Sequence, residues 1–194
     1  MNDIMKRMRT LFWRFFNLLR FRVHGIKYGS RTIIHGHIGL CIHGKTELGN
    51  NCYISSGMDM NPLCARSNGF ICVENGAKLR IGDNCAMSSP RVWTHQEIVI
   101  GNNVMLGGNV TIVDSDCHSL NYEYRRDIVK DQQYKKNKPV CIENDVFIGM
   151  NVIILKGVTI GARSIIGAGS VVTKSIPADC LAAGNPAIII KKLI

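Results

Sequence analysis

A repeat of six residues runs through most of this chain. Aliphatic residues occupy every sixth position over two stretches: Ile100, Leu106 and Ile112, then Ile142, Ile148, Ile154, Ile160, Ile166 and Val172. Small or β-branched residues stand two places before them, at Val104, Val110, Val146, Val152, Val158, Ser164 and Ser170. This period matches neither an α-helix nor a strand that alternates two faces. It predicts a β-solenoid, whose coils bury a narrow strip against each other.

The repeat also marks its own bends. The segments Gly49-Asn50-Asn51, Gly82-Asp83-Asn84, Gly101-Asn102-Asn103 and Glu143-Asn144-Asp145 each follow an aliphatic residue. Gly, Asn and Asp accept the left-handed backbone conformation of tight turns, so we expect corners there. Three hexads separate Ile142 from Ile160, which predicts a triangular coil with one short strand on each face.

The first 22 residues, MNDIMKRMRTLFWRFFNLLRFR, interleave apolar and basic side chains. No apolar run in them exceeds three residues, so the pattern is neither a signal peptide nor a membrane span. Residues 1–31 hold eight Lys or Arg and one acidic residue, so 8 − 1 = +7 of the formal charge of +10 lies in this segment. Because the positive charge is concentrated in one short segment, nucleic acid is disfavoured as the partner. Two interpretations stay open: a basic amphipathic helix on an anionic membrane, or a cap on the first coil.

Eight cysteines occur without a C-x-x-C pair. This usage predicts free thiols in a reducing compartment. We therefore expect a cytoplasmic protein, with peripheral membrane contact through residues 1–22 as the remaining question.

The hexads stop after Ile112. If the period continued, Asp116 would take a small interior position and His118 an aliphatic one, and burying an unpaired carboxylate is costly. We therefore expect the coil to leave its register between residues 113 and 118. A polar segment, residues 119–138, follows before the repeat resumes, and loops of this length are usually functional.

The segments IGDNCAM, IGNNVML, IENDVFIGMNVIILKGVTIGARSIIGAGSVVTKSIP and AAGNPA resemble the hexapeptide-repeat acyltransferases. The resemblance spans about residues 81–186 and is greatest to the maltose, galactoside and exopolysaccharide O-acetyltransferases. It implies an all-β, left-handed parallel β-helix that uses acetyl-CoA without a metal and forms a homotrimer with sites between subunits. We expect a basic N-terminal segment at 1–30, the β-helix at 31–176 and a C-terminal segment at 177–194.

The segment TIVDSDCHSL resembles the active-site segment of these enzymes, which makes His118 the general base. An imidazole suits proton removal near neutral pH. Asp114 or Asp116 would orient the ring, or would only cap the turn. Cys117 is interpreted as a packing residue and not as a nucleophile.

The resemblance also implies binding residues. The expected cofactor-binding residues are Gly149, Met150, Ala168, Thr173, Lys174 and Lys191, and the expected acceptor-binding residues are Ser88, His95 and Tyr122, with Tyr124, Arg125 and Arg126 in the same loop. Each has a structural alternative: Gly149 and Ala168 fit corner geometry, and Lys174 fits a solvated cation.

The function implied is acetyl-CoA-dependent O-acetylation of a sugar or glycan precursor in polysaccharide biosynthesis, by direct transfer. A zinc hydratase of the γ-carbonic anhydrase type and a non-catalytic scaffold are the alternatives. Residues 39–46 match the phosphate-loop pattern G-x-x-x-x-G-K-T, but the turn residues that follow predict no helix behind it. His35, His37 and His43 are interpreted as scattered histidines and not as a metal site.

Overall fold

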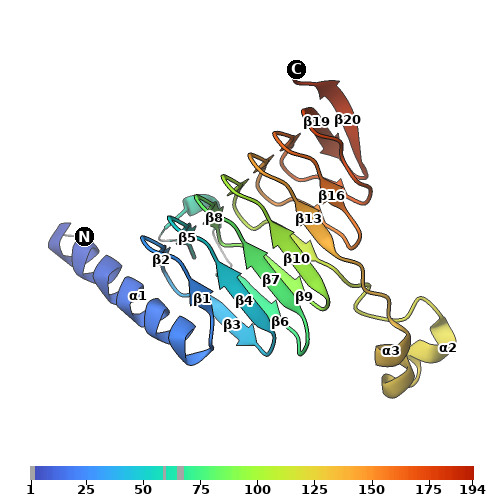
Figure 1. The fold of residues 1–194 in the computed structure, drawn as a ribbon, viewed down its shortest axis with the longest axis horizontal. Coiled ribbons are helices and arrows are strands. Elements are labelled where there is room, and N and C mark those ends of the chain that lie inside the picture. The colour runs from blue at the N-terminus through green and yellow to red at the C-terminus, as the bar shows by residue number, and fades with distance from the viewer. Residues whose placement is uncertain (1–2, 59, 65–67) are drawn as a thin grey trace.

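The computed structural model describes residues 3–58, 60–64 and 68–194, and it shows a left-handed parallel β-helix. Three parallel sheets form the faces of a triangular prism, helix α1 (Asp3–Val23) lies across its N-terminal end, and two short helices project from its side (Figure 1). The predicted fold class is confirmed. Residues 1–2 of the predicted N-terminal segment lie outside the described residues.

Each coil adds one strand to each sheet. The first sheet holds β1 (Lys27–Tyr28), β4 (Lys45–Leu48), β7 (Lys78–Ile81), β10 (Glu97–Ile100), β13 (Val140–Ile142) and β16 (Thr159–Ile160). The second holds β2 (Ile33–His35), β5 (Tyr53–Ser55), β8 (Ala86–Ser88), β11 (Met105–Leu106), β14 (Phe147–Ile148), β17 (Ile165–Ile166), β19 (Cys180–Gly184) and β20 (Ala187–Lys192). The third holds β3 (Gly39–Ile42), β6 (Phe70–Val73), β9 (Arg91–Thr94), β12 (Thr111–Val113), β15 (Ile153–Ile154) and β18 (Val171–Val172). A 3-10 turn, η1, spans Pro62–Cys64.

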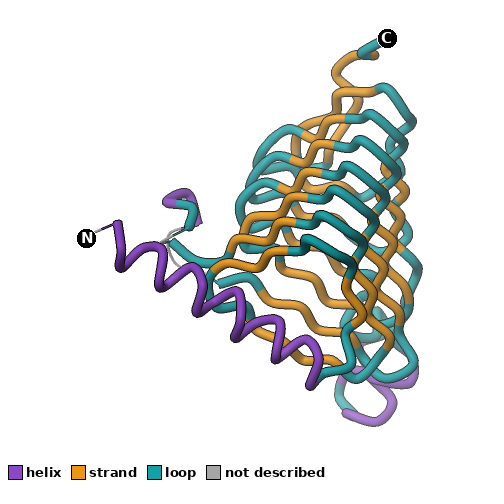
Figure 2. Tube along the Cα trace, turned by 60° about the vertical axis from the view of Figure 1, so that its left-hand side comes forward, coloured by secondary structure: helices purple, strands orange, loops and turns teal. Residues whose placement is uncertain are grey.

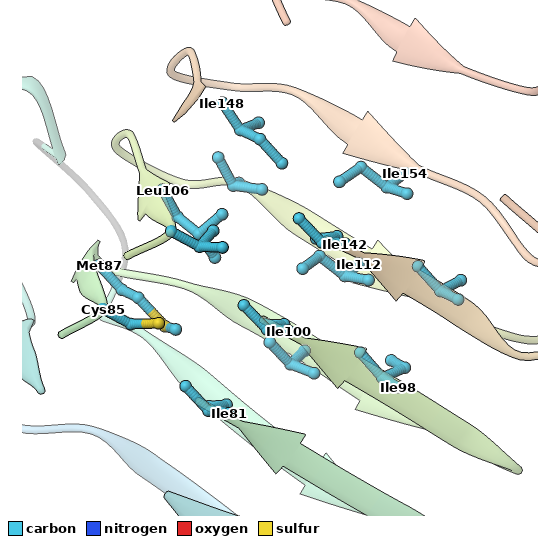
Figure 3. Close-up of a cluster of buried hydrophobic side chains, with 14 of the residues drawn as sticks. Ile81, Cys85, Met87, Ile98, Ile100, Leu106, Ile112, Ile142, Ile148 and Ile154 are labelled. Carbon is cyan, nitrogen blue, oxygen red and sulfur yellow. The ribbon is translucent and has the colours of Figure 1, made fainter. Parts of the chain in front are cut away.

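The six-residue repeat supplies the core. Ile100, Ile142 and Ile160 stack in register along the first sheet, and all three are buried. Figure 3 shows isoleucines of successive coils, among them Ile112 and Ile154, turned into the same interior. Burial of this strip is the main stabilising term of a solenoid, because each coil contacts only its neighbours.

The predicted corners form a ladder along one edge of the prism. Asn51, Asn84, Asn103 and Asp145 have φ angles of 56°, 58°, 58° and 61°, which is the left-handed region. Their side chains are hydrogen-bonded from coil to coil at 2.9, 3.1 and 2.9 Å. Asn and Asp therefore satisfy both the backbone conformation and the polar groups of each bend.

Helix α1 covers the open first coil. Its Asn17 is fully buried and donates to the carbonyl oxygens of Ile34 and Gly36 at 3.3 and 2.8 Å, and Phe21 is also fully buried. Arg20 donates to the carbonyl oxygen of Ile38 at 2.6 Å. These contacts are those of a capping helix. Among the described residues, no helix is both long and apolar enough to span a bilayer.

A hairpin closes the C-terminal end of the stack. The hairpin β19–β20 is the antiparallel pair that follows the last coil. Residues 39–46, which match the phosphate-loop pattern, lie in strands β3 and β4 and the corner between them. That pattern is therefore part of the prism and opens no helix.

Candidate active site

The expected break in register lies directly after β12. The coil stops at Val113 and resumes at Val140, and the two ends of the inserted segment are tied together. The amide of Asp116 donates to the carbonyl oxygen of Lys136 at 3.0 Å, and the amide of Lys138 donates to that of Asp114 at 2.8 Å. This neck lets the segment project from the prism (Figures 1 and 2). The expected loop 119–138 contains two helices that the sequence analysis did not foresee: α2 (Tyr122–Arg125) and α3 (Ile128–Tyr134).

His118 lies at this neck and is paired with an acidic residue of α3. Its Nδ1 is 2.6 Å from Oδ2 of Asp131, whose other oxygen accepts the amide of Ser119 at 2.7 Å. The hydrogen bond from His118 is the largest cause that holds the pKa of Asp131 below its usual value, so the carboxylate is ionised and Nδ1 donates. The side chain of His118 is 67% exposed. Nε2 is thus the ring nitrogen available to take a proton.

The inserted segment braces this pair from within. Asp127 caps α3 by accepting the amides of Val129 and Lys130 at 2.9 and 3.1 Å. The rings of Tyr124 and Tyr134 stack at 4.3 Å between centroids and join α2 to α3. Arg125 donates to the carbonyl oxygen of Ser119 at 2.6 Å. Asp131 is therefore held in place by a folded unit.

Asp114 and Asp116 have other partners than the imidazole. Asp114 is fully buried and accepts three backbone amides, from residues 95, 96 and 97, at 2.6, 2.8 and 2.7 Å. Asp116 pairs with Lys156 of the next coil at 3.3 Å. Asp114 thus has the turn-capping role, and the orienting position expected for one of these two residues is taken by Asp131.

His95 lies beside the same helix. Its Nδ1 is 3.2 Å from Nζ of Lys135, which is one helical turn beyond Asp131, and its ring packs on Trp93 at 4.7 Å between centroids. Burial, and then the charge of Lys135, lowers the pKa of His95. The ring is therefore neutral, with Nδ1 as the acceptor. Nε2 of His95 is buried and has no hydrogen-bond partner within the described part of the chain. Helix α3 contacts His118 through Asp131, and its C-cap residue Lys135 contacts His95.

An apolar groove of about 360 Å³ lies on the outer face of the third sheet and reaches the residue before His118. Its lining includes Phe70, Cys72, Arg91, Trp93, Thr111 and Cys117. Burial raises the pKa of the Cys117 thiol, and this disfavours the thiolate. In the described ranges 3–58, 60–64 and 68–194, no three His, Cys, Asp or Glu side chains are grouped as metal ligands.

A family model described as the bacterial transferase hexapeptide, with six repeats, matches residues 142–174. These residues form the last regular coils of the prism. Over these residues the chain matches the hexapeptide-repeat transferase family. The chain spans about three fifths of the length of the curated relatives that it matches.

Three members of the hexapeptide-repeat family show how far the similarity extends. The galactoside O-acetyltransferase of Lactococcus lactis is 37% identical over 148 residues, which cover 76% of this chain and 63% of the relative. A solved hexapeptide-repeat acetyltransferase of Vibrio cholerae is 27% identical, with a TM-score of 0.61 over 92% of this chain and 79% of its own. A galactoside acetyltransferase in complex with coenzyme A is 26% identical, with a TM-score of 0.51 over 85% and 66%.

The cofactor-binding residues expected from the hexapeptide-repeat resemblance lie on both sides of the third sheet. Thr173 and Lys174 are exposed and follow β18, on the edge of the prism where His95 follows β9 and the neck follows β12. Gly149, Met150 and Ala168 lie at the opposite edge, before β15 and β18. A Cβ at Gly149 would be 2.6 Å from the amide nitrogen of Ala168, so coil stacking alone requires this glycine. Lys191 is exposed on β20.

Two expected acceptor residues lie apart from His118. Ser88 belongs to the second sheet. Its hydroxyl is hydrogen-bonded to the hydroxyl of Ser55 at 3.1 Å and accepts from the side-chain amide of Asn61 at 2.7 Å. Tyr122 is exposed on α2 under the guanidinium of Arg126, 5.2 Å from its ring centre. Within the described chain, neither residue has a hydrogen bond or a ring contact with His118 or His95.

Asp131 and Lys135 were not among the residues predicted from the sequence. Asp131 is on α3 and Lys135 is the C-cap residue that follows it, and the available signal was Asp127, an N-cap residue before Ile128 and Val129. A helix over residues 128–134 would have placed Asp131 within it and Lys135 directly after its last residue.

Proposed function

We propose that this protein is an acetyl-CoA-dependent O-acetyltransferase that acts on a hydroxyl of a sugar or glycan precursor. The observation that carries the proposal is the pair of His118 and Asp131, 2.6 Å apart at the interruption of the coils between β12 and β13, beside an apolar groove. The similarity to a galactoside O-acetyltransferase and to a coenzyme A complex supports both the chemistry and the donor.

The reaction follows from the orientation of the imidazole. Because Asp131 accepts from Nδ1, Nε2 of His118 takes the proton of the acceptor hydroxyl as its oxygen attacks the thioester carbonyl. A C–O bond forms, the C–S bond breaks, and the imidazolium returns its proton to the leaving thiolate. Asp131 stabilises the imidazolium without taking its proton, as the carboxylate of a catalytic triad does. No covalent intermediate with the protein is required.

His95 is suited to bind the acceptor. A neutral ring whose Nδ1 accepts from Lys135 carries its proton on Nε2, and that buried nitrogen has no partner in the described chain. An unsatisfied buried donor is costly until a ligand oxygen accepts from it. A sugar hydroxyl or the thioester oxygen supplies such an acceptor.

The donor would lie along the third sheet, between the two rows of corners that hold Met150 and Ala168 on one side and Thr173 and Lys174 on the other. Lys174 and Lys191 would meet its phosphates. This proposal includes a homotrimer with sites between subunits. In such a trimer the outer face of the second sheet, where Tyr53 is exposed, would pack against a neighbouring subunit.

A screen of sugars and glycan precursors with acetyl-CoA tests the proposed function. Release of free thiol that depends on the acceptor, with an O-acetylated product seen by mass spectrometry, is the expected result. Binding of acetyl-CoA without transfer to any acceptor would contradict the activity, and absence of acetyl-CoA binding would favour a scaffold. Stoichiometric zinc together with carbon dioxide hydration would favour the hydratase instead.

A further inference from the structure

We propose that the outer face of α1 docks on an anionic lipid bilayer, with the helix lying in the plane of the membrane surface. The proposal is independent of the transfer chemistry. It rests on a division of α1 into two faces: one side of the helix lies against the prism and the other points away from it (Figure 2), and the large apolar side chains on that outer side are exposed.

The inner face of α1 is fixed by buried contacts. Asn17 and Phe21 are fully buried against the first coil, one helical turn apart. In a helix with about 3.6 residues per turn, residues two places away are rotated by about 200°. Phe15 and Leu19 therefore point away from the prism, and they are 74% and 50% exposed. The cap does not use these two large side chains.

The outer apolar face is continuous. It comprises Met8, Leu11, Phe12, Phe15, Phe16, Leu19 and Val23, all of them exposed, at the spacing of three and four residues that makes one stripe. The rings of Phe12 and Phe16 stack on it at 5.6 Å between centroids. A stripe of this size is unfavourable in water and marks an interaction surface.

The positive charge of α1 favours an anionic lipid surface over a second copy of the chain as the partner of this face. Exposed Arg14 and Arg22 flank the stripe, and α1 contains no acidic residue after Asp3. Residues 1–31 hold eight Lys or Arg against that single acid. Two copies joined through this face would bring arginines together, whereas anionic headgroups would neutralise them while the aromatic rings enter the interface.

The prism also prepares the helix for binding. A free amphipathic peptide loses conformational entropy when it folds on a membrane, but α1 is already helical because Asn17, Arg20 and Phe21 hold it on the first coil. Docking would place the first coil at the bilayer and β19–β20 at the far end of the prism (Figure 1).

Vesicle flotation of the full chain tests this proposal. The native protein should float with vesicles of phosphatidylcholine mixed with phosphatidylglycerol, much less with phosphatidylcholine alone, and less as salt is raised. The double variant Phe15→Glu/Leu19→Glu should lower the partition by more than about tenfold, because it removes apolar insertion and adds two repelled charges.

The matched control is Ile128→Glu/Val129→Glu, which adds the same charge at two exposed apolar positions on α3. It should float like the native chain, and circular dichroism and thermal unfolding should show all variants folded. Equal flotation of Phe15→Glu/Leu19→Glu and the native chain would overturn the proposal. A second result would also overturn it: the native chain does not bind anionic vesicles, and light scattering shows that Phe15→Glu/Leu19→Glu loses an oligomer that the native chain forms. The outer face of α1 would then join copies of the chain.

Discussion

Asp131→Asn should nearly abolish acetyl transfer while leaving the fold intact. The native carboxylate has two acceptors in use, one for Nδ1 of His118 at 2.6 Å and one for the amide of Ser119 at 2.7 Å. Asparagine has a single acceptor oxygen. The backbone amide of Ser119 can only donate, so it claims that oxygen and the new NH₂ group faces Nδ1. The ring then carries its proton on Nε2 and cannot accept one from a hydroxyl.

The size of this effect follows from what a misplaced proton costs. General base catalysis contributes about 10² to 10⁴ in rate, and the equivalent substitution in a Ser-His-Asp triad lowers kcat by about 10⁴. His118 is 67% exposed, so water competes for the ring more than it does in a sealed triad. We therefore expect kcat to fall by about 10² to 10³, with the KM for acetyl-CoA little changed.

The assay is thiol release from acetyl-CoA with the best acceptor, together with ¹⁵N NMR of the imidazole to identify the tautomer. Asp127→Asn is the matched control, because it makes the same substitution on the same helix and asparagine also serves as an N-cap. Turnover of Asp131→Asn within threefold of that control would refute the reasoning. So would an unchanged tautomer in the NMR spectrum of a variant that has lost turnover.

Three further outcomes are expected. Asp114→Ala should destabilise the fold by about 2–4 kcal/mol in denaturant unfolding, because three amides lose their acceptor; a change below about 0.5 kcal/mol would contradict the capping role. Cys117→Ala should keep turnover within a few-fold of native, since its raised pKa disfavours the thiolate; complete loss would make it a nucleophile. The lowered pKa of Asp131 means that its stabilising contribution is present above about pH 4 and is lost as the pH falls through its folded-state value. The difference in thermal stability between native protein and Asp131→Asn should therefore shrink in acid, and a constant difference would exclude this linkage.

The fold could be predicted because its signal is local and repeated. The position of a residue within the hexad predicts whether it is buried or forms a corner. Ile142 lies in the interior and Asn103 lies at a corner, as their positions predict. The break after Ile112 could be predicted for the same reason, since Asp116 and His118 do not fit the interior. Handedness was the exception, because periodicity has no chirality and only the family resemblance implied it.

The site was predicted less completely because its contacts are not periodic. The partner of His118 lies 13 residues further on, inside an insertion where the hexads give no information. Asp114 and Asp116 are closer to His118 in sequence, but they have other partners: Asp114 accepts backbone amides, and Asp116 pairs with Lys156. Similarly, nothing near His95 in the sequence indicates Lys135, which reaches it only because the inserted segment brings the C-terminal end of α3 next to His95.

Turnover of His118→Ala is the most direct test of the account, measured as acceptor-dependent thiol release alongside calorimetric binding of acetyl-CoA. The exposed ring contributes little to the core, so the variant should fold, bind acetyl-CoA as the native chain does, and lose transfer by at least about a hundredfold. Transfer at a near-native rate by a folded His118→Ala protein would contradict the assignment of this residue as the base.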